Sequence, residues 1–276
     1  MKSSLGLLSI LTLGAGILAT LPAVAQVPDK PVRLVLQITV DQLRSDLIDR
    51  FSAGYGEGGF RRLLSDGAFY IDAHHRHANT ETVVGHATLA TGTDPAIHGM
   101  VANNWLDRTT GLLNYNVQDP DFPLVGEGAG VDASTEIDPT QALATTEGRS
   151  PRPILTTTIS DEFRVALGPR SRIFGVSVKD RGAITMAGHA GTAYWLSKAA
   201  ARMVTSTYYM EDYPDWVKDW NESGVVQSYG DTAWELSSDP AAYLFEASDD
   251  QPWETDFPGW GRTFPHAYGP ADGQYY

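Results

Sequence analysis

The sequence predicts an α/β fold organised around a mostly parallel sheet. Residues 32–40 (V-R-L-V-L-Q-I-T-V) are apolar and rich in β-branched side chains, which is typical of a strand buried on both faces. Asp41 follows, and residues 42–51 then place apolar side chains at helical spacing. Open α/β sheets bind their ligands at the carboxyl ends of strands, so this order makes Asp41 a candidate ligand-binding residue. The alternative is that Asp41 is an ordinary helix N-cap.

Strands and helices continue to alternate along the chain. Helices are expected at residues 60–64 and 156–167, strands at residues 68–73 and 172–178, and a hairpin at residues 105–117. Residues 118–153 are rich in Gly, Pro, Asp, Ser and Thr, which indicates a surface insertion with little regular structure. The pattern is therefore one of strand and helix units interrupted by a polar segment.

The first 25 residues have the features of a secretory signal peptide. Lys2 precedes an apolar run at residues 5–21, and a small-x-small cleavage pattern ends at Ala25. A membrane anchor is the less favoured alternative, because two glycines and a proline interrupt the run and no stop-transfer charges follow. Cleavage after about Ala25 predicts a periplasmic or secreted protein that has no stable membrane association.

The composition narrows the classes of function. The chain has no cysteine, so any metal must be held by carboxylates, imidazoles or hydroxyls. Its formal net charge of −14 argues against nucleic acid as a partner. An acidic protein that handles an anionic substrate needs a local reversal of charge, which a bound divalent cation would supply.

Residues 79–105 carry most of the chemical information in the chain. Thr82 stands before a run of small residues, which predicts a helix whose first turn has unpaired backbone N–H groups suited to binding phosphate. Asn103 follows 21 residues later and offers an amide that can donate to a second oxygen of the same group. Thr82 is thus a candidate nucleophile and Asn103 a candidate oxyanion donor.

Lys179 and Arg181 follow the strand predicted at residues 172–178. Side chains at positions i and i+2 lie on the same side of an extended segment, so both cations could meet one phosphoryl group. The alternative is an exposed polar strand end at which Asp180 neutralises a neighbour.

Two further groups of residues have competing interpretations. The contiguous H-H-R-H run at residues 74–77 does not direct its imidazoles at one point, which favours a solvated or substrate-rim loop over a metal site. His86 could act as a general base, although a packing role is favoured. The aromatic segment at residues 194–221 suggests either a carbohydrate or base platform or, as we favour, the packing of a small subdomain.

Taken together, these segments resemble the alkaline phosphatase superfamily, and within it the periplasmic threonine-nucleophile phosphatases of the PafA type. The resemblance rests on I-T-V-D-Q-L-R around Asp41, T-E-T-V-V-G-H-A-T-L-A-T-G-T-D-P-A-I-H-G around Thr82, N-N-W-L-D around Asn103, and V-K-D-R-G-A around Lys179 and Arg181. It implies a three-layer αβα sandwich with a mostly parallel central sheet and surface insertions.

The resemblance also implies roles for the candidate residues. Asp41 and Thr82 would bind one of two zinc ions, and Thr82 would form a phosphothreonine intermediate. Asn103, Lys179 and Arg181 would bind the non-bridging oxygens of small phosphate monoesters. The expected function is that of a secreted zinc-dependent phosphomonoesterase.

The motifs that complete the family's metal pair do not follow the Lys-x-Arg pair. Asp94 and His98 have the spacing of the Asp-x-x-x-His motif but lie inside the nucleophile segment, while His189 and His266 lack the neighbouring carboxylates that the family's motifs need. The resemblance therefore implies that residues 26–276 are the N-terminal portion of a catalytic domain, incomplete at the C-terminus and poorly active alone. Insertions are expected at about 105–153 and 182–255.

Two other functions fit the same sequence. One is a phosphodiesterase or nucleotide pyrophosphatase on the same fold, which the Lys-x-Arg pair disfavours. The other is a non-catalytic exoprotein that binds phosphate or glycans, suggested by the aromatic segment. The residues identify neither the physiological substrate nor the oligomeric state.

Overall fold

The computed structural model describes residues 32–126, 128–131, 136, 138–244, 248–256 and 260–269. The chain divides into two units, Met1–Thr39 and Val40–Tyr276. The signal peptide expected at residues 1–25 lies outside the described residues. Among the helices that the structure describes, none is both long and apolar enough to span a bilayer.

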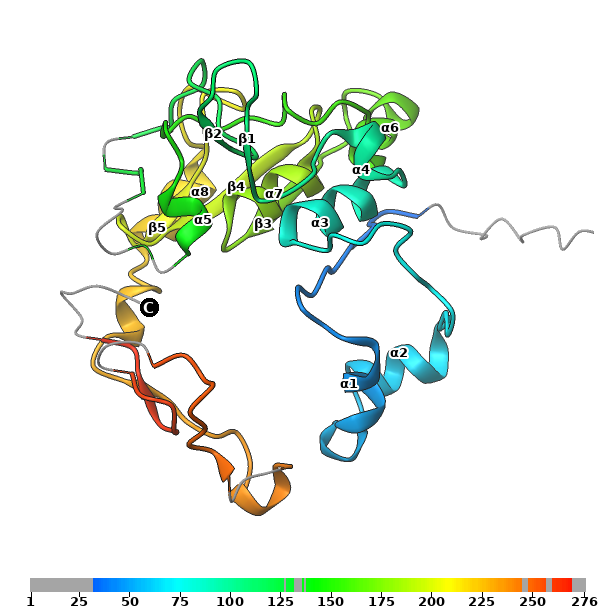
Figure 1. Ribbon diagram of the computed structural model, residues 1–276, viewed down its shortest axis with the longest axis vertical. Coiled ribbons are helices and arrows are strands. Elements are labelled where there is room, and N and C mark those ends of the chain that lie inside the picture. Colours follow the sequence, from blue (N-terminus) through cyan, green and yellow to red (C-terminus); the bar gives the residue numbers. More distant parts are fainter. Residues whose placement is uncertain are drawn as a thin grey trace, which may run out of the picture. The chain divides into compact units, whose positions relative to one another are not determined.

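The core of the second unit is a three-stranded sheet covered by one helix. Strands β3 (Phe174–Ser177) and β4 (Thr192–Ser197) are parallel, and β5 (Arg202–Val204) is antiparallel to β4. Helix α7 (Asp180–Ala187) connects β3 to β4 and packs on both strands, and α3 (Thr82–Thr91) packs against α7 (Figure 1). The arrangement therefore places α3 next to α7.

The contact between β3 and α7 depends on a glycine. A Cβ atom on Gly175 would lie 2.2 Å from the backbone oxygen of Ala183 and 2.8 Å from the backbone nitrogen of Ala187. The apolar residues around this contact are fully or nearly fully buried: Ala183, Ile184, Ala187, Ala193, Trp195 and Val204. The absence of a side chain at Gly175 therefore lets the second half of α7 pack directly on β3.

The hairpin and the helices that the sequence predicts form close to their expected positions, together with helices that it did not predict. Strands β1 (Asn104–Leu106) and β2 (Leu113–Tyr115) pair antiparallel. The remaining helices are α1 (Ser45–Arg50), α2 (Phe60–Asp66), α4 (Pro95–His98), α5 (Pro139–Ala142), α6 (Ile159–Leu167) and α8 (Asp215–Glu222), with 3₁₀ turns at Ser52–Gly54, Gln227–Tyr229 and Pro240–Ala242. Strands β6 (Ala233–Trp234) and β7 (His266–Ala267) form a separate antiparallel pair.

Two predicted strands do not form. Residues 32–40 belong to no strand and their apolar side chains are exposed, Leu34 by 77% and Ile38 by 73%. Residues 68–73 contain no strand either. A strand requires a backbone neighbour to hydrogen-bond with, and β4 is the neighbour of β3 in the described sheet. An apolar pattern indicates which faces a segment can bury, but it does not provide the partner.

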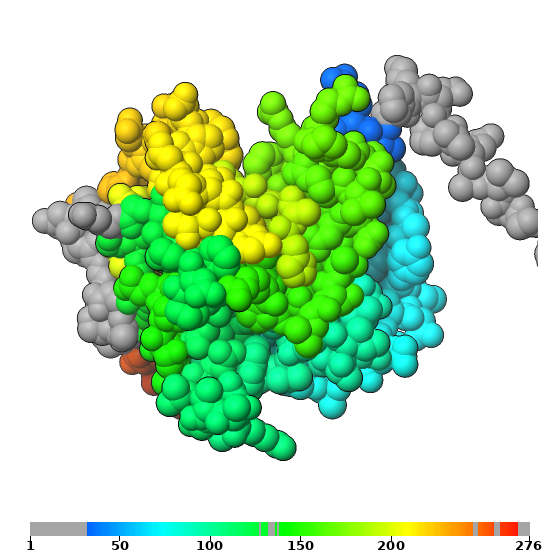
Figure 2. All heavy atoms as spheres, turned by 90° about the horizontal axis from the view of Figure 1, so that it is seen from above, coloured from blue at the N-terminus to red at the C-terminus, as the bar shows by residue number. Residues whose placement is uncertain are grey.

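Residues 118–153 contain little regular structure, as predicted, but the segment is not confined to the surface. Arg149 and Ser150 are buried. The backbone nitrogen of Val125 donates to the carbonyl of Thr205 at 2.9 Å, and the hydroxyl of Tyr213 donates to the carbonyl of Val125 at 2.7 Å. Figure 2 shows residues 118–153, in green, beside the segment that contains Thr205 and Tyr213, in yellow. The insertion boundaries at about 105–153 and 182–255 remain predictions.

Candidate active site

Thr82 begins α3, as the sequence predicts. Its hydroxyl donates to the Asp41 carboxylate, with Oγ1 3.3 Å from Oδ2. The following residues, Val83 and Val84, are fully buried and hold the first turn of the helix against the core. The two residues expected to share a metal ion are therefore in contact, and Thr82 is carried on a well-packed helix.

Asn103 lies against the same helical turn. Its side-chain oxygen accepts a hydrogen bond from the backbone nitrogen of Val83 at 3.1 Å, and its own backbone nitrogen donates to Glu81 Oε2 at 2.5 Å. On the other side, Asn116 donates to the Asn103 carbonyl through both its backbone and its side chain, at 3.2 and 2.7 Å. The structure thus brings Asn103 next to Thr82 and restrains it from two directions.

Lys179 and Arg181 lie on a helix start rather than on an extended strand end. Lys179 is the N-cap of α7, and Arg181 is in its first turn. Both side chains nevertheless reach one carboxylate. Asp138 Oδ2 is 3.1 Å from the Lys179 ammonium and 2.9 Å from Nη2 of Arg181. We refer to Lys179 and Arg181 as the cation pair.

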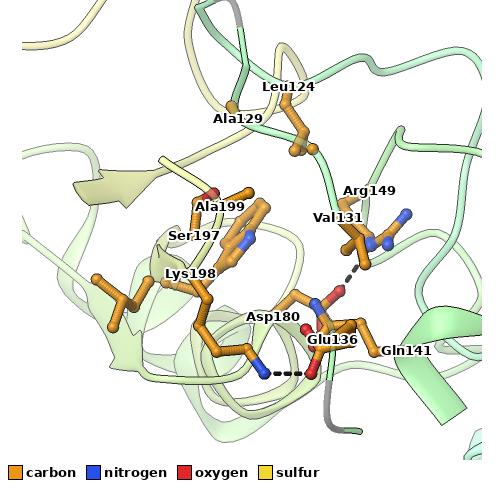
Figure 3. Close-up of a pocket in the computed structure, with 13 residues that line it drawn as sticks. Leu124, Ala129, Val131, Glu136, Gln141, Arg149, Asp180, Ser197, Lys198 and Ala199 are labelled. Atoms are coloured by element: carbon orange, nitrogen blue, oxygen red, sulfur yellow. Dashed lines mark hydrogen bonds and ion pairs between the residues drawn. The ribbon is translucent and has the colours of Figure 1, made fainter. Parts of the chain in front are cut away.

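A second carboxylate extends this cluster. Glu136 Oε1 lies 3.5 Å from the Lys179 ammonium and also contacts the ammonium of Lys198. Figure 3 shows Lys198 and Glu136 pointing toward each other in a pocket that they line, close to the Arg149 and Asp180 pair. Glu136 and Asp138 were not among the residues singled out from the sequence. Asp138-Pro139 is a recognisable N-cap pattern that predicts the start of α5, but the pattern does not reveal which cations the carboxylate will meet.

The cluster contains three cationic side chains and two carboxylates, so its positive charge is only partly offset. Burial alone would raise the pKa of Asp138, but the hydrogen bond from Thr140 and the charges of Arg181 and Lys179 outweigh burial and hold this pKa well below its usual range. Burial is also the largest influence on Lys198, and its pKa is lowered. Asp138 is therefore ionised at neutral pH and offsets part of the positive charge of the cation pair.

A buried network supports the start of α7. The Asp180 carboxylate is 2.6 Å from Nε of Arg149 and accepts a hydrogen bond from the hydroxyl of Tyr115 at 2.5 Å. Nη1 of Arg181 donates to the same hydroxyl at 3.3 Å. Burial, followed by the nearby charge of Asp180, raises the pKa of Tyr115 well above its usual value, so the phenol stays protonated. Asp180 thus neutralises Arg149, a partner that the sequence interpretation did not identify.

Helix α7 approaches α3 at Gly182. A Cβ atom on this residue would lie 2.7 Å from Ser177 Oγ and 3.9 Å from Nε2 of His86. His86 is buried, and its Nδ1 is 2.8 Å from the carbonyl of Thr82. These contacts agree with the packing role favoured for His86. They also bring the helix that carries the cation pair against the helix that begins with Thr82.

The described residues contain no group of three or more His, Asp or Glu side chains that could hold a metal ion. His74 and His75 are exposed, and His77 hydrogen-bonds to the Asn79 carbonyl and the Thr88 hydroxyl. Residues 74–77 belong to no helix or strand, in agreement with their interpretation as a loop.

Comparisons with known proteins identify the family. Residues 35–233 match the model of the type I phosphodiesterase / nucleotide pyrophosphatase family. Alkaline phosphatase PhoV of Synechococcus elongatus is 35% identical over 239 residues, which are 86% of this chain and 40% of PhoV. Alkaline phosphatase PafA of Elizabethkingia meningoseptica is 33% identical over 223 residues, 80% of this chain and 38% of PafA. The chain thus spans about 40% of the length of these relatives.

Solved structures agree on the fold. The crystal structure of wild-type PafA superposes with a TM-score of 0.70 at 32% identity, covering 82% of this chain and 41% of that one. A PafA variant in which a threonine, an asparagine, a lysine and an arginine are replaced gives a TM-score of 0.70 at 30% identity, covering 83% and 42%. The expected alkaline-phosphatase-like α/β fold is confirmed. The chain belongs to the type I phosphodiesterase / nucleotide pyrophosphatase family, within the alkaline phosphatase superfamily.

Proposed function

We propose that the complete protein is a phosphomonoesterase that forms a covalent phosphothreonine at Thr82. The observation that carries this proposal is the position of Thr82 at the start of α3, with its hydroxyl 3.3 Å from Asp41 and the amide of Asn103 on the same turn. The solved PafA variant adds support. Its four replaced residues have the same types as Thr82, Asn103 and the cation pair, with the same separations of 21 and two positions.

Asp41 and Thr82 suit one zinc ion. Two oxygen ligands, each about 2.0–2.2 Å from a tetrahedral zinc, lie roughly 3.3–3.6 Å apart. The 3.3 Å between Asp41 Oδ2 and Thr82 Oγ1 falls in that range. We propose two zinc ions in the complete enzyme, one of them held partly by these residues. A bound cation would lower the pKa of the threonine hydroxyl and stabilise the leaving alkoxide.

The proposed reaction has two displacements at phosphorus. In the first, Thr82 Oγ1 bonds to phosphorus while the bond from phosphorus to the ester oxygen breaks, releasing the alcohol. The hydroxyl proton of Thr82, which points toward Asp41 Oδ2 before the attack, leaves Oγ1, and the departing ester oxygen takes up a proton to become the alcohol. In the second, a water oxygen bonds to phosphorus and the bond to Oγ1 breaks, which restores Thr82 and releases inorganic phosphate.

Asn103 and the cation pair would stabilise the charge on the non-bridging oxygens. The Asn103 side-chain oxygen is already used by the backbone of Val83, which leaves its NH₂ group to donate to the phosphoryl group. Lys179 and Arg181 would contact the remaining oxygens as charged donors. From the N-terminal signal pattern we propose that this activity is periplasmic or secreted.

The experiment is hydrolysis of p-nitrophenyl phosphate by the protein expressed from the complete open reading frame. Thr82→Ala should abolish turnover, because it removes the attacking oxygen, and Thr82→Ser should retain part of it. Thr91→Ala is the matched control. It removes a hydroxyl at the far end of the same helix, where Oγ1 bonds to the Ala87 carbonyl, and should leave turnover unchanged. Undiminished turnover in Thr82→Ala would refute the proposal.

The second candidate function is phosphodiester hydrolysis, which the family description favours. Both reactions can use the same nucleophile, so Thr82→Ala does not separate them. They differ in the charge of the substrate, since a monoester brings two negative charges at alkaline pH and a diester brings one. The cation pair is therefore the feature that distinguishes the two functions.

A further inference from the structure

Asp138 is the described carboxylate that contacts both members of the cation pair. Its Oδ2 lies 3.1 Å from Nζ of Lys179 and 2.9 Å from Nη2 of Arg181. The side chains of Asp138 and Arg181 are 12% and 6% exposed, and that of Lys179 is 27% exposed. The contacts are therefore mostly shielded from solvent, where ion pairs are stronger than at an open surface.

The other oxygen of Asp138 is fixed by the protein. Oδ1 accepts hydrogen bonds from the backbone nitrogen of Thr140 at 3.0 Å and from its hydroxyl at 2.6 Å. These bonds make Asp138 the N-cap of α5. Because one oxygen is held by the helix start, the other presents its charge in a defined direction.

Arg181 depends on its terminal nitrogens for orientation. Its Nε is buried without a hydrogen-bond partner among the described residues. Nη1 lies 3.3 Å from the Tyr115 hydroxyl and 3.5 Å from that of Thr140, while Nη2 meets the Asp138 carboxylate. The carboxylate contact is the charged one and the shortest of the three, so it contributes most to holding the guanidinium.

Lys179 and Arg181 carry like charges and share a partly buried region, so they repel each other. Lysine is also flexible and has no preferred direction of its own. We propose that Asp138 is a positioning residue that holds the two cations side by side, ready to bind one phosphoryl group. This role rests on the proposed function of the cation pair. Asp138 would affect phosphate binding only through Lys179 and Arg181, without touching the phosphate itself.

The proposal predicts the sign of a measurable change. If Asp138 positions the cation pair, Asp138→Asn lets the two charges separate and weakens phosphate binding. If Asp138 only neutralises the pair, the same substitution removes a negative charge and makes phosphate bind more tightly. The two possibilities therefore predict opposite shifts.

The test is the affinity of the complete protein for inorganic phosphate, measured by isothermal titration calorimetry. Asp138→Asn should weaken binding roughly tenfold, the loss expected for one charged hydrogen bond. In a Lys179→Ala/Arg181→Ala background, the same substitution should have no further effect. Asp138→Glu should recover part of the affinity, because it restores the carboxylate. Equal or tighter binding by Asp138→Asn overturns the proposal, as does the same tenfold loss without the cation pair.

Two further variants guard against a folding defect. Asp121→Asn removes a carboxylate that lies 2.7 Å from Arg152 on the exposed surface, and it should leave phosphate affinity unchanged. Thr140→Val keeps the charge of Asp138 but removes the 2.6 Å hydrogen bond to its carboxylate and the 3.5 Å contact with Arg181, so it should weaken phosphate binding severalfold. If Asp138→Asn does not fold, unchanged affinity in Thr140→Val overturns the proposal.

The failure of this proposal and that of the proposed function have different signatures. Phosphate affinity is measured without turnover, so the role of Asp138 is judged by the calorimetry alone. Absence of p-nitrophenyl phosphate hydrolysis, or undiminished hydrolysis in Thr82→Ala, overturns the phosphatase. A wild-type protein that binds no inorganic phosphate overturns both.

Discussion

Arg149 Nε lies 2.6 Å from Asp180 Oδ2, and the two side chains are 2% and 0% exposed. Arg149 also donates through Nη1 to the carbonyls of Thr146 and Gly148, at 2.6 and 2.9 Å. The pair therefore joins an irregular loop to the first residue of α7. Because Arg181 follows Asp180 directly, the pair also supports the backbone that carries the proposed phosphate-binding cations.

Breaking this pair from one side should strongly destabilise the protein. Arg149→Met or Asp180→Asn leaves the remaining charged or polar group buried without its partner, which typically costs about 3–5 kcal/mol of the free energy of unfolding. Denaturant unfolding of each variant measures the loss. Lys218→Met removes an exposed ion pair with Asp212 and should leave the midpoint unchanged. Equal effects for the buried and exposed pairs would contradict this account.

The contact between Asp161 and His189 should make stability depend on pH in two ranges. Asp161 Oδ2 is 3.0 Å from His189 Nδ1 and accepts a 2.8 Å hydrogen bond from the backbone of Thr158. Burial alone would raise the pKa of Asp161, but these bonds lower it from 3.8 to about 2. The hydrogen bond that His189 donates to Asp161 is the main reason that the pKa of His189 is raised above 6.5.

The sign of each contribution follows from these shifts. The Asp161 contribution is present above its unfolded pKa of 3.8 and is lost as the pH falls toward 2. The His189 contribution is complete below pH 6.5 and is lost as the pH rises through the raised folded-state pKa. The stability difference between wild type and Asp161→Asn should therefore be largest near pH 5, measured by denaturant unfolding at several pH values.

His189→Gln separates the two ranges. This variant should lose the contribution of His189 to the pH dependence of stability above pH 6.5. It should retain much of the contribution of Asp161 below pH 4, because Asp161 still accepts backbone hydrogen bonds from Thr158 and Ala190. A wild-type advantage over Asp161→Asn that does not change between pH 2 and pH 5 would show that the carboxylate does not stabilise the fold through its charge.

The local parts of the site could be predicted from the sequence, but its long-range partners could not. Thr82 was recognisable because small residues follow it directly, and helix starts depend on adjacent positions. Asp138 meets Lys179 and Arg181 across more than 40 residues of chain, and no local pattern encodes that contact.

The environment of Arg149 was also hidden from the sequence. Arginines are rarely fully buried unless they are paired, and a polar segment rich in Gly and Pro is expected at the surface. The charged partner of Arg149 is Asp180, 31 positions away, and no local pattern indicates that the two will meet. Residues 32–40 show the opposite case, a predicted element that does not form. Their apolar pattern suits a strand, but their backbone has no strand neighbour in the described sheets.

Two glycines close to the site should respond in opposite ways to alanine. Gly175→Ala would place a methyl group 2.2 Å from the Ala183 carbonyl oxygen, where the backbone must move, and should cost roughly 1–3 kcal/mol or more. Gly85→Ala adds a methyl group inside α3 with nothing within 4 Å, and should stabilise the helix by about 0.5–1 kcal/mol. Thermal unfolding of both variants provides the comparison, and a destabilised Gly85→Ala would show that this face of α3 is covered.

The cation pair should determine whether the enzyme prefers monoesters to diesters. Arg181→Ala and Lys179→Ala remove charged donors that would face the non-bridging oxygens, so each should lower kcat/KM for p-nitrophenyl phosphate by about a hundredfold. The loss for bis-p-nitrophenyl phosphate should be much smaller, because a diester brings one negative charge instead of two. Comparing kcat/KM for the two substrates in each variant cancels differences in protein quality or metal content. Equal losses on both substrates would favour a diesterase, in which the pair does not discriminate by substrate charge.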